Sequence, residues 1–177
     1  PVAESAGQPT DLVVRLGIYP HQVERVVQYE RQELEKIGAE YRFVTPRSED
    51  EALEAARQAD GILNAGMTLT RRAVEALERC RVIVQCSVGV ERVDVAAATE
   101  RGIVVANLPD MCTNEVADQA MALLLACNRK IVRLNSRVKS GTWDRALLEP
   151  MPRLHGTTIG LLAFGRIAQA VATRARA

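Results

Sequence analysis

The stretch VIVQCSVGVERVDVAAATERGIVV, residues 82–105, contains the pattern that decides the fold. It opens with an apolar run typical of a buried strand at residues 82–85, and a second such run follows at residues 103–105. Between them, residues 95–100 have the composition of a short helix, and Gly102 separates this helix from the second strand. A strand, a helix and a strand in this order predict a β-α-β unit with parallel strands.

The same alternation covers most of the chain before this stretch. We expect strands at residues 12–19, 41–45 and 61–63, and helices at residues 21–37, 48–59 and 70–79. Gly38 is a typical end for the first helix, Ser48-Glu-Asp-Glu51 is a capping box at the start of the second, and Thr70 is a cap for the third. This order of elements predicts an α/β fold with a parallel sheet covered by helices on both faces.

The chain after residue 106 has a different pattern. Residues 113–138 have a helical apolar period, which predicts one long helix capped by Thr113, and residues 141–152 are expected to form a loop or arm. A strand at residues 157–162 and a helix at residues 166–174 would begin a second α/β unit. One strand and one helix cannot bury their own apolar faces, so we expect either a fragment of a longer protein or a unit that packs on another surface.

Composition and charge exclude several classes of protein. The chain has 177 residues, 23 Lys and Arg against 22 Asp and Glu, a net charge of +1 and 3% aromatic residues, which argues against a nucleic-acid binder that works by bulk charge or base stacking. The basic stripe of Arg129, Arg133 and Arg137 is read as a solvated or subunit-facing surface. No apolar run is long enough to span a membrane and residues 1–10 lack a secretory pattern, so we expect a cytoplasmic protein.

The cysteines and histidines do not have the spacing of a metal site. The candidate ligands are Cys80, Cys86, Cys112, Cys127, His21 and His155. Because no Cys-x-x-Cys pair occurs, we expect reduced, buried thiols and no metal.

Three turns follow expected strands and are candidates for ligand binding. Successive amides at residues 87–90 could form a nest for a carboxylate, or this turn could be a plain connection with Asp94 as the helix cap. Residues 64–67 and 107–115 also follow strands, and open α/β sheets bind ligands at the carboxyl ends of their strands.

The last expected strand and helix have the spacing of a dinucleotide fingerprint, with Ala163, Gly165 and Ala168 at its three positions. A pyrophosphate would rest on the amides that begin the helix after Gly165. Ala163 departs from the usual glycine, so an ordinary strand-to-helix turn stays open as the alternative.

Four segments, taken in order, resemble the D-isomer-specific 2-hydroxyacid dehydrogenase family. They are Cys86–Asp94, Gly102–Pro109, Asn114–Leu125 and Leu154–Ala168, and the resemblance runs from about residue 60 to the end. Phosphoglycerate dehydrogenases, glyoxylate/hydroxypyruvate reductases and C-terminal-binding corepressors look alike over this span, so the subfamily stays open.

The resemblance implies a domain organisation. After an N-terminal tail at residues 1–10, a flavodoxin-like substrate domain covers residues 11–106, a crossing helix and dimerisation arm cover residues 107–152, and residues 153–177 begin a Rossmann NAD(P)-binding domain. We expect a homodimer contact in the arm, where Trp143 lies near Leu147 and Leu148; packing against the chain's own second domain is the alternative.

The resemblance also implies an oxidoreductase that transfers hydride between NAD or NADP and a small 2-oxo or 2-hydroxy acid. The implied substrate-binding residues are Ala65, Gly66, Met67, Val88, Gly89 and Val90. The implied cofactor-binding residues are Val88, Thr113, Val116, Phe164, Gly165, Arg166 and Ile167.

The resemblance places the catalytic Arg, Glu and His after the last residue of this chain, so no catalytic residue is assigned and the chain alone is expected to be inactive. His21 and His155 are interpreted as cap-like or solvent-facing. Two alternatives stay open: an NAD(H)-sensing, corepressor-like binding protein of the same fold, and a non-catalytic α/β module in which Ala163 blocks the cofactor.

Overall fold

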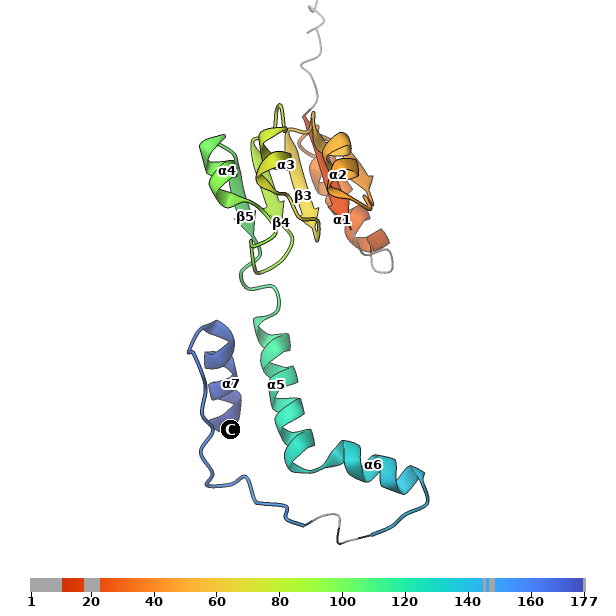
Figure 1. Cartoon of the computed structure of the whole chain (residues 1–177), viewed down its shortest axis with the longest axis vertical. Helices are drawn as coiled ribbons and strands as arrows, with labels where there is room; N and C mark the ends of the chain where they lie inside the picture. Colours follow the sequence, from red (N-terminus) through yellow and green to blue (C-terminus); the bar gives the residue numbers. More distant parts are fainter. Residues whose placement is uncertain (1–10, 18–22, 145, 147–148, 177) are drawn as a thin grey trace, which may run out of the picture. The chain divides into compact units, whose positions relative to one another are not determined.

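The structure is a computed structural model that describes residues 11–17, 23–144, 146 and 149–176. The chain forms two compact units that divide between Met111 and Cys112 (Figure 1), and each is described by itself. His21, Leu147 and Leu148 lie outside the described residues.

The first unit is built on a parallel sheet of five strands. Its order is β2-β1-β3-β4-β5, and the strands are β1 (Leu12–Gly17), β2 (Glu40–Val44), β3 (Gly61–Ala65), β4 (Val82–Gln85) and β5 (Val104–Asn107). This is the strand order of the flavodoxin-like doubly wound fold. The predicted α/β fold with a flavodoxin-like parallel sheet is therefore confirmed.

Four helices accompany the sheet: α1 (Val23–Glu35), α2 (Glu49–Ala56), α3 (Arg71–Glu75) and α4 (Val95–Glu100). The hydrophobic core lies between one face of the sheet and helices α2, α3 and α4, with members such as Leu16, Ile62 and Ile83. On the opposite face, α1 supplies Glu30, which accepts hydrogen bonds from Arg15 of β1 and Tyr41 of β2. Helix α4 has the predicted bounds, whereas α2 and α3 end earlier than predicted.

Of the four residues predicted to begin helices as caps, two make the side-chain hydrogen bond and two do not. The Ser48 hydroxyl accepts a hydrogen bond from the Glu51 amide at 3.2 Å, and the Asp94 carboxylate accepts one from the Ala97 amide at 2.8 Å. Thr70 and Thr113 make no side-chain cap bond, and Thr113 is the first residue of its helix, after Cys112 as the cap. The prediction that Thr113 caps its helix is wrong, whereas Thr70 does occupy the cap position of α3, without a side-chain hydrogen bond.

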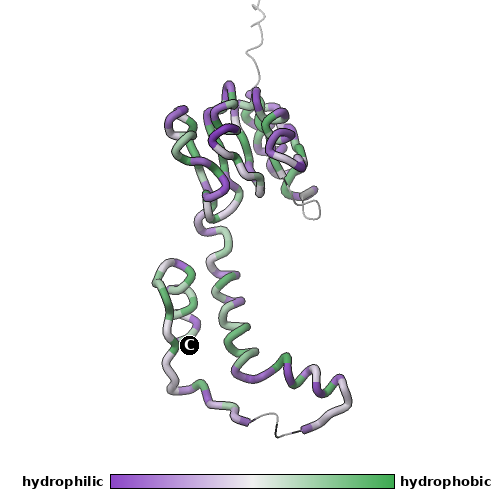
Figure 2. Tube along the Cα trace, viewed as in Figure 1, coloured by the Kyte–Doolittle hydropathy of each residue, from purple (hydrophilic) through white to green (hydrophobic). Residues whose placement is uncertain are grey.

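The second unit contains α5 (Thr113–Asn128), α6 (Ile131–Lys139) and α7 (Arg166–Arg176). The prediction of one continuous helix over residues 113–138 is wrong, because Lys130 has a left-handed backbone with φ 52° that separates α5 from α6. Helix α7 packs on α5: Ala117 and Val171 are buried, and Arg174 donates to Asp118 at 2.5 Å. Figure 2 shows the apolar residues that run along α5.

Residues 157–162 form no strand. A strand needs a neighbour for its backbone N–H and C=O groups, and no described residue pairs with this segment in a ladder. The prediction of a strand here is therefore wrong, whereas the predicted helix after it is confirmed as α7. Within the described ranges, no helix is both long and apolar enough to cross a membrane.

Candidate functional site

The candidate site of the first unit lies where β1, β3 and β4 end. Because the strands are parallel, their carboxyl ends meet at one edge of the sheet. A cavity of about 410 Å³ opens there, within the range of small-molecule sites. Its lining residues are Arg15, Gly17, Val26, Ala65, Gly66, Gln85, Cys86, Ser87, Arg92 and Met111.

A chain of buried hydrogen bonds joins the loops after β3 and β4. Asn64, which is fully buried, donates from Nδ2 to the Met67 carbonyl and to Gln85 Oε1, both at 2.8 Å, and its Oδ1 accepts from the Met67 amide at 3.1 Å. Gln85 then donates to the Ser87 hydroxyl at 2.9 Å, and this hydroxyl donates to the Gly89 carbonyl at 2.9 Å. The two loops are thus held in one arrangement without a ligand.

The loop after β5 also forms hydrogen bonds with the turn after β4. Asn107 donates from Nδ2 to the Val88 carbonyl at 2.6 Å, and the Leu108 amide donates to the Ser87 carbonyl at 3.0 Å. The turns after β3 and β4 and the start of the predicted turn at residues 107–115 therefore meet in the first unit. The buried role of Gln85 was not predicted; its signal in the sequence is an amide residue at the end of an otherwise apolar strand. In the structure Gln85 lies opposite Asn64 in the register of β3 and β4.

The amides of the turn after β4 divide into two groups. The Ser87 amide donates to the Gln85 carbonyl at 2.8 Å, so its predicted part in an anion nest is wrong. Among the described residues, none accepts a hydrogen bond from the amides of Val88, Gly89 or Val90. These three donors follow the cavity-lining Ser87; Val88 is exposed, Gly89 and Val90 are half-buried, and the Glu91 carboxylate lies against Gly89.

Of the three predicted substrate-binding residues in the loop after β3, two line the cavity and the third belongs to the core. Ala65 and Gly66 line the cavity, and Gly66 has φ 115°, a conformation that L side chains rarely adopt. The Met67 side chain is 8% exposed and belongs to the core. Only the main chain of Met67 takes part in the hydrogen bonds at the site.

Two charged residues and one thiol face the cavity. Arg15 is 8% exposed and pairs with Glu30, while Arg92 is exposed. Burial raises the pKa of the Cys86 thiol, and the Arg15 cation opposes this shift only in part. Burial likewise raises the pKa of Cys80 to about 11. Neither thiol is therefore an activated nucleophile.

The predicted cofactor residues of the second unit lie at the start of its helices. Thr113 and Val116 are in the first turn of α5, where Val116 is 40% exposed. Phe164, Gly165, Arg166 and Ile167 surround the start of α7, and its first turn holds no acidic residue. A Cβ built on Gly165 would meet nothing within 4 Å, so the space beside this backbone is open.

Ala163 has a left-handed backbone with φ 67°. This is the first position of the fingerprint, where glycine would adopt the same conformation without steric cost. His155, before this segment, is exposed. Within the described ranges, no group of three His, Cys, Asp or Glu side chains could hold a metal ion.

Comparison with known proteins identifies the family. The family model described as "D-isomer specific 2-hydroxyacid dehydrogenase, catalytic domain" matches residues 22–176. This chain belongs to that family. The resemblance stated from the sequence is therefore confirmed.

Curated relatives of the family share more than a third of the matched residues with this chain. A D-3-phosphoglycerate dehydrogenase from Methanocaldococcus jannaschii is 39% identical over 145 residues, which are 81% of this chain and 27% of the relative. A glyoxylate reductase from Pyrococcus furiosus is 38% identical over 134 residues, 72% of this chain and 40% of the relative. The chain thus spans well under half the length of these relatives.

Several solved structures share the fold of this chain. An acyclic imino acid reductase in complex with NADPH and D-Arg has a TM-score of 0.80 at 22% identity, with 93% of this chain and 52% of that chain covered. A glyoxylate reductase from Paecilomyes thermophila has a TM-score of 0.77 at 23% identity, with coverages of 96% and 53%. At such identities the similarity supports the fold alone.

Proposed function

We propose that this chain is part of an NAD(P)-dependent oxidoreductase that transfers hydride between a nicotinamide cofactor and a small 2-oxo or 2-hydroxy acid. The observation that carries the proposal is the turn after β4, where the amides of residues 88–90 donate to no residue that the structure describes. The bonds of Asn64, Gln85 and Asn107 hold this turn, whose Ser87 lines the cavity. Family membership and the oxidoreductases among the relatives support the same reaction class.

The amides of Val88, Gly89 and Val90 suit the carboxylate of such an acid. Backbone donors bind an anion without a competing side-chain charge, and a nest of successive amides presents them together. Because the loop is already ordered by its hydrogen bonds, little ordering remains to oppose binding. In this proposal these amides fix the carboxylate of the acid.

The residues around the start of α7 fit the pyrophosphate of a dinucleotide. The helix is 11 residues long, its first turn has no carboxylate to repel phosphate, and the backbone beside Gly165 is open. Val88, Thr113 and Val116 are proposed to line the nicotinamide, and Phe164, Gly165, Arg166 and Ile167 the pyrophosphate. When bound, the cofactor supplies or accepts the hydride; the choice between NAD and NADP is not assigned.

The reaction also needs a proton donor or acceptor at the substrate oxygen, which usually contributes 10²–10⁴-fold to the rate. None of the described residues that line the cavity is a His, Asp or Glu. We therefore propose that the 177-residue chain binds the acid but does not reduce or oxidise it by itself.

We also propose that the protein is a homodimer. The support is the exposed apolar surface of α6 and the residues after it, where Val132 is 74% exposed and Trp143 is 84% exposed. An exposed tryptophan among aliphatic side chains is typical of protein interfaces.

The carboxylate site is tested by NMR titration of the ¹⁵N-labelled chain with D-lactate, using D-lactamide as the matched neutral control. We expect D-lactate to shift the amide resonances of Val88, Gly89 and Val90, and lactamide to leave them in place. If D-lactate shifts none of these three amides, the proposed substrate site is wrong.

A further inference from the structure

A negatively charged side chain lies against the turn that is proposed to bind the carboxylate of the substrate. The side chain of Glu91 folds back onto Gly89, so that its carboxylate fills the space where a Cβ of residue 89 would stand. Cδ of Glu91 lies 2.8 Å and Oε1 lies 3.0 Å from that position, and Oε2 lies closer still. Gly89 is the middle residue of the three whose amides have no acceptor among the described residues.

The missing Cβ of Gly89 is what makes room for this carboxylate. The glycines with a left-handed φ are Gly38, Gly66, Gly102, Gly141 and Gly156. Because Gly89 is not among them, its backbone conformation does not require a glycine. A side chain at position 89 would instead collide with the Glu91 carboxylate and displace it.

The Glu91 carboxylate has no other partner that the structure describes. None of the hydrogen bonds and ion pairs among the described residues includes it, although Arg92 follows it in the chain. Its side chain is exposed, so neither burial nor a cation holds it against Gly89. A run of unbonded amide N–H groups attracts an anion, and the amides of residues 88–90 directly precede Glu91.

We propose that Glu91 is an intramolecular competitor of the substrate and sets how strongly this site prefers a carboxylate to a neutral group. Without a ligand its carboxylate lies over Gly89, and an acid binds the amides of residues 88–90 as this side chain moves away. Where the two carboxylates stay close, their like charges oppose binding. The inference rests on the proposed function, since it takes the carboxylate of the substrate to bind these amides.

Displacement of Glu91 leaves the shape of the turn unchanged. The turn is held by the hydrogen bonds from Gln85 to Ser87, from Ser87 to the Gly89 carbonyl and from Asn107 to the Val88 carbonyl, and Glu91 takes part in none of them. Exposed side chains change rotamer within picoseconds to nanoseconds. Removing the charge of Glu91 should therefore raise the affinity for an acid, which a variant with a damaged site would not do.

NMR titration of the ¹⁵N-labelled 177-residue chain, read at the amide resonances of residues 88–90, tests the inference. Glu91→Gln keeps the size of the side chain and removes its charge, and we expect it to bind D-lactate about fivefold more tightly than the parent. This is the factor that two like charges about 4 Å apart give in water. Neutral D-lactamide should leave the resonances in place in both proteins.

Salt separates an effect of charge from an effect of shape. In 1 M NaCl, where the Debye length is about 3 Å, the dissociation constants of the parent and of Glu91→Gln for D-lactate should become nearly equal. A fivefold difference that persists at this salt concentration would overturn the competition between like charges.

Glu54→Gln is the matched control. Glu54 is an exposed residue of α2 that does not line the cavity, and its replacement removes the same charge from the chain. This variant should bind D-lactate as the parent does. An equal gain of affinity in the two variants would show that the net charge of the chain is responsible, and would overturn the role given to Glu91.

Two failures of this experiment have different meanings. If D-lactate shifts the amides of residues 88–90 in the parent and Glu91→Gln binds it no more tightly, the inference is overturned while the proposed carboxylate site stands. If D-lactate shifts these amides in neither protein, the inference and the proposed carboxylate site are both overturned.

Discussion

Two buried amide side chains, Asn64 and Gln85, decide the geometry of the candidate site at the scale of single residues. They face each other across β3 and β4 and connect the Met67 main chain to the Ser87 hydroxyl. Buried polar groups that lose one partner leave the other unsatisfied. The pair therefore couples the stability of the sheet to the shape of the turn that presents the free amides.

Replacing Gln85 by Leu should destabilise the protein by about 1–3 kcal/mol, because Asn64 Nδ2 loses one acceptor and the Ser87 hydroxyl loses its donor. It should also weaken D-lactate binding, since the turn is no longer fixed. Urea unfolding and calorimetry measure the two effects.

Ile83→Val on the same strand is the control for a purely structural defect. It removes one buried methylene, which costs about 0.5–1.5 kcal/mol, and touches none of these hydrogen bonds. Lactate affinity should survive in Ile83→Val; equal losses of affinity in the two variants would contradict a positioning role for Gln85.

Ala163 is the second decisive residue, because it holds a left-handed conformation that costs an L-residue about 1–2 kcal/mol. Ala163→Gly should relieve this strain and strengthen NADH binding several-fold, as measured by fluorescence titration. Ala170→Gly in α7 is the control and should lower helix stability by about 1 kcal/mol without improving affinity. Unchanged or weaker NADH binding by Ala163→Gly would show that residue 163 does not limit the cofactor site.

At the residue scale, sequence reasoning found the positions that a local rule governs and missed those governed by contacts. Ser48 and Asp94 are caps because their short acceptors reach the amide three residues later, a rule visible in the sequence. The engagement of the Ser87 amide by Gln85 depends on how the chain turns after β4, which spacing alone does not determine.

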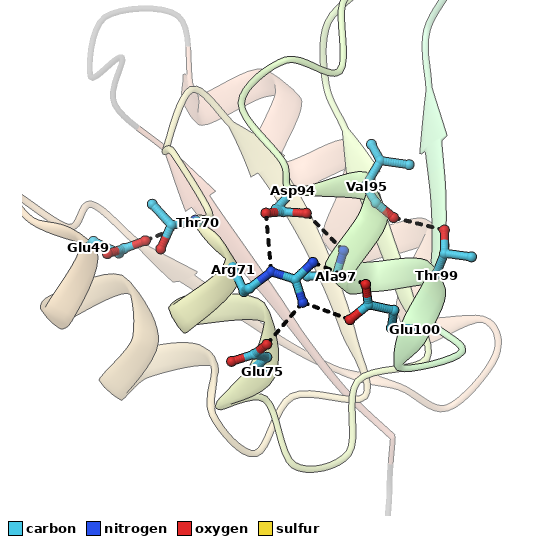
Figure 3. Close-up of polar contacts among 9 residues, drawn as sticks. All are labelled: Glu49, Thr70, Arg71, Glu75, Asp94, Val95, Ala97, Thr99 and Glu100. Atoms are coloured by element: carbon cyan, nitrogen blue, oxygen red, sulfur yellow. Dashed lines mark hydrogen bonds and ion pairs between the residues drawn. The ribbon is translucent and has the colours of Figure 1, made fainter.

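At the scale of elements, Arg71 links α3 to α4 (Figure 3). Its guanidinium donates to both oxygens of Glu100 at 2.7 and 3.1 Å and to Glu75 at 3.1 Å, and its Nε lies 4.0 Å from Asp94 Oδ2. Both helices are short, with five and six residues, and bury only small side chains besides Val74. Such helices depend on links to their neighbours more than on their own propensity.

Arg71→Gln should lower the thermal midpoint slightly, by at most about 4 °C at low salt, because the ion pairs are exposed. The difference from the parent should shrink in 1 M NaCl, where the Debye length is about 3 Å.

The same link predicts a pH dependence. The hydrogen bond from Arg71 holds the pKa of Glu100 below its ordinary value of 4.5. A lowered carboxyl pKa stabilises the folded state above the ordinary value, and this contribution disappears as the pH falls below it. Between pH 5 and pH 3 the free energy of unfolding should therefore fall less in the Arg71→Gln variant than in the parent. Equal decreases in the two proteins would contradict the link. Arg57→Gln is the control and should show the same decrease as the parent.

The break between α5 and α6 shows why element boundaries were harder to predict than element types. Residues 128–131 contain neither glycine nor proline, and Asn128 with the basic residues after it is a weaker signal of a helix end, which the apolar period running on to residue 138 outweighed. The Lys130 amide nevertheless donates to the Cys127 carbonyl, and Asn128 donates to the Pro152 carbonyl at 3.4 Å. The end of α5 is thus stabilised by a contact with a segment 24 residues away, which a periodic pattern does not contain.

At the scale of the whole molecule, the β-α-β pattern predicted parallel strands, and the flavodoxin-like topology implied by the family resemblance contains the observed strand order. The strand expected at residues 157–162 was not formed, although its composition is that of a strand. Strand formation needs a partner, whereas α7 satisfies its own backbone hydrogen bonds and forms as predicted. Patterns within one element therefore predicted helices of the second unit better than they predicted its strand.

The exposed apolar surface of the second unit predicts that the protein forms a homodimer. Along α6, Ile131, Val132 and Val138 are all more than half exposed, and Trp143 follows them. Sedimentation velocity at about 10 μM should give roughly twice the chain mass of 19.4 kDa. Trp143→Ala should raise the dissociation constant at least tenfold, as expected for an aromatic anchor in an interface. Tyr29→Ala removes an aromatic side chain of α1 that is 64% exposed and should leave the mass unchanged. A monomeric parent chain would instead favour the alternative that this surface packs within a single protein.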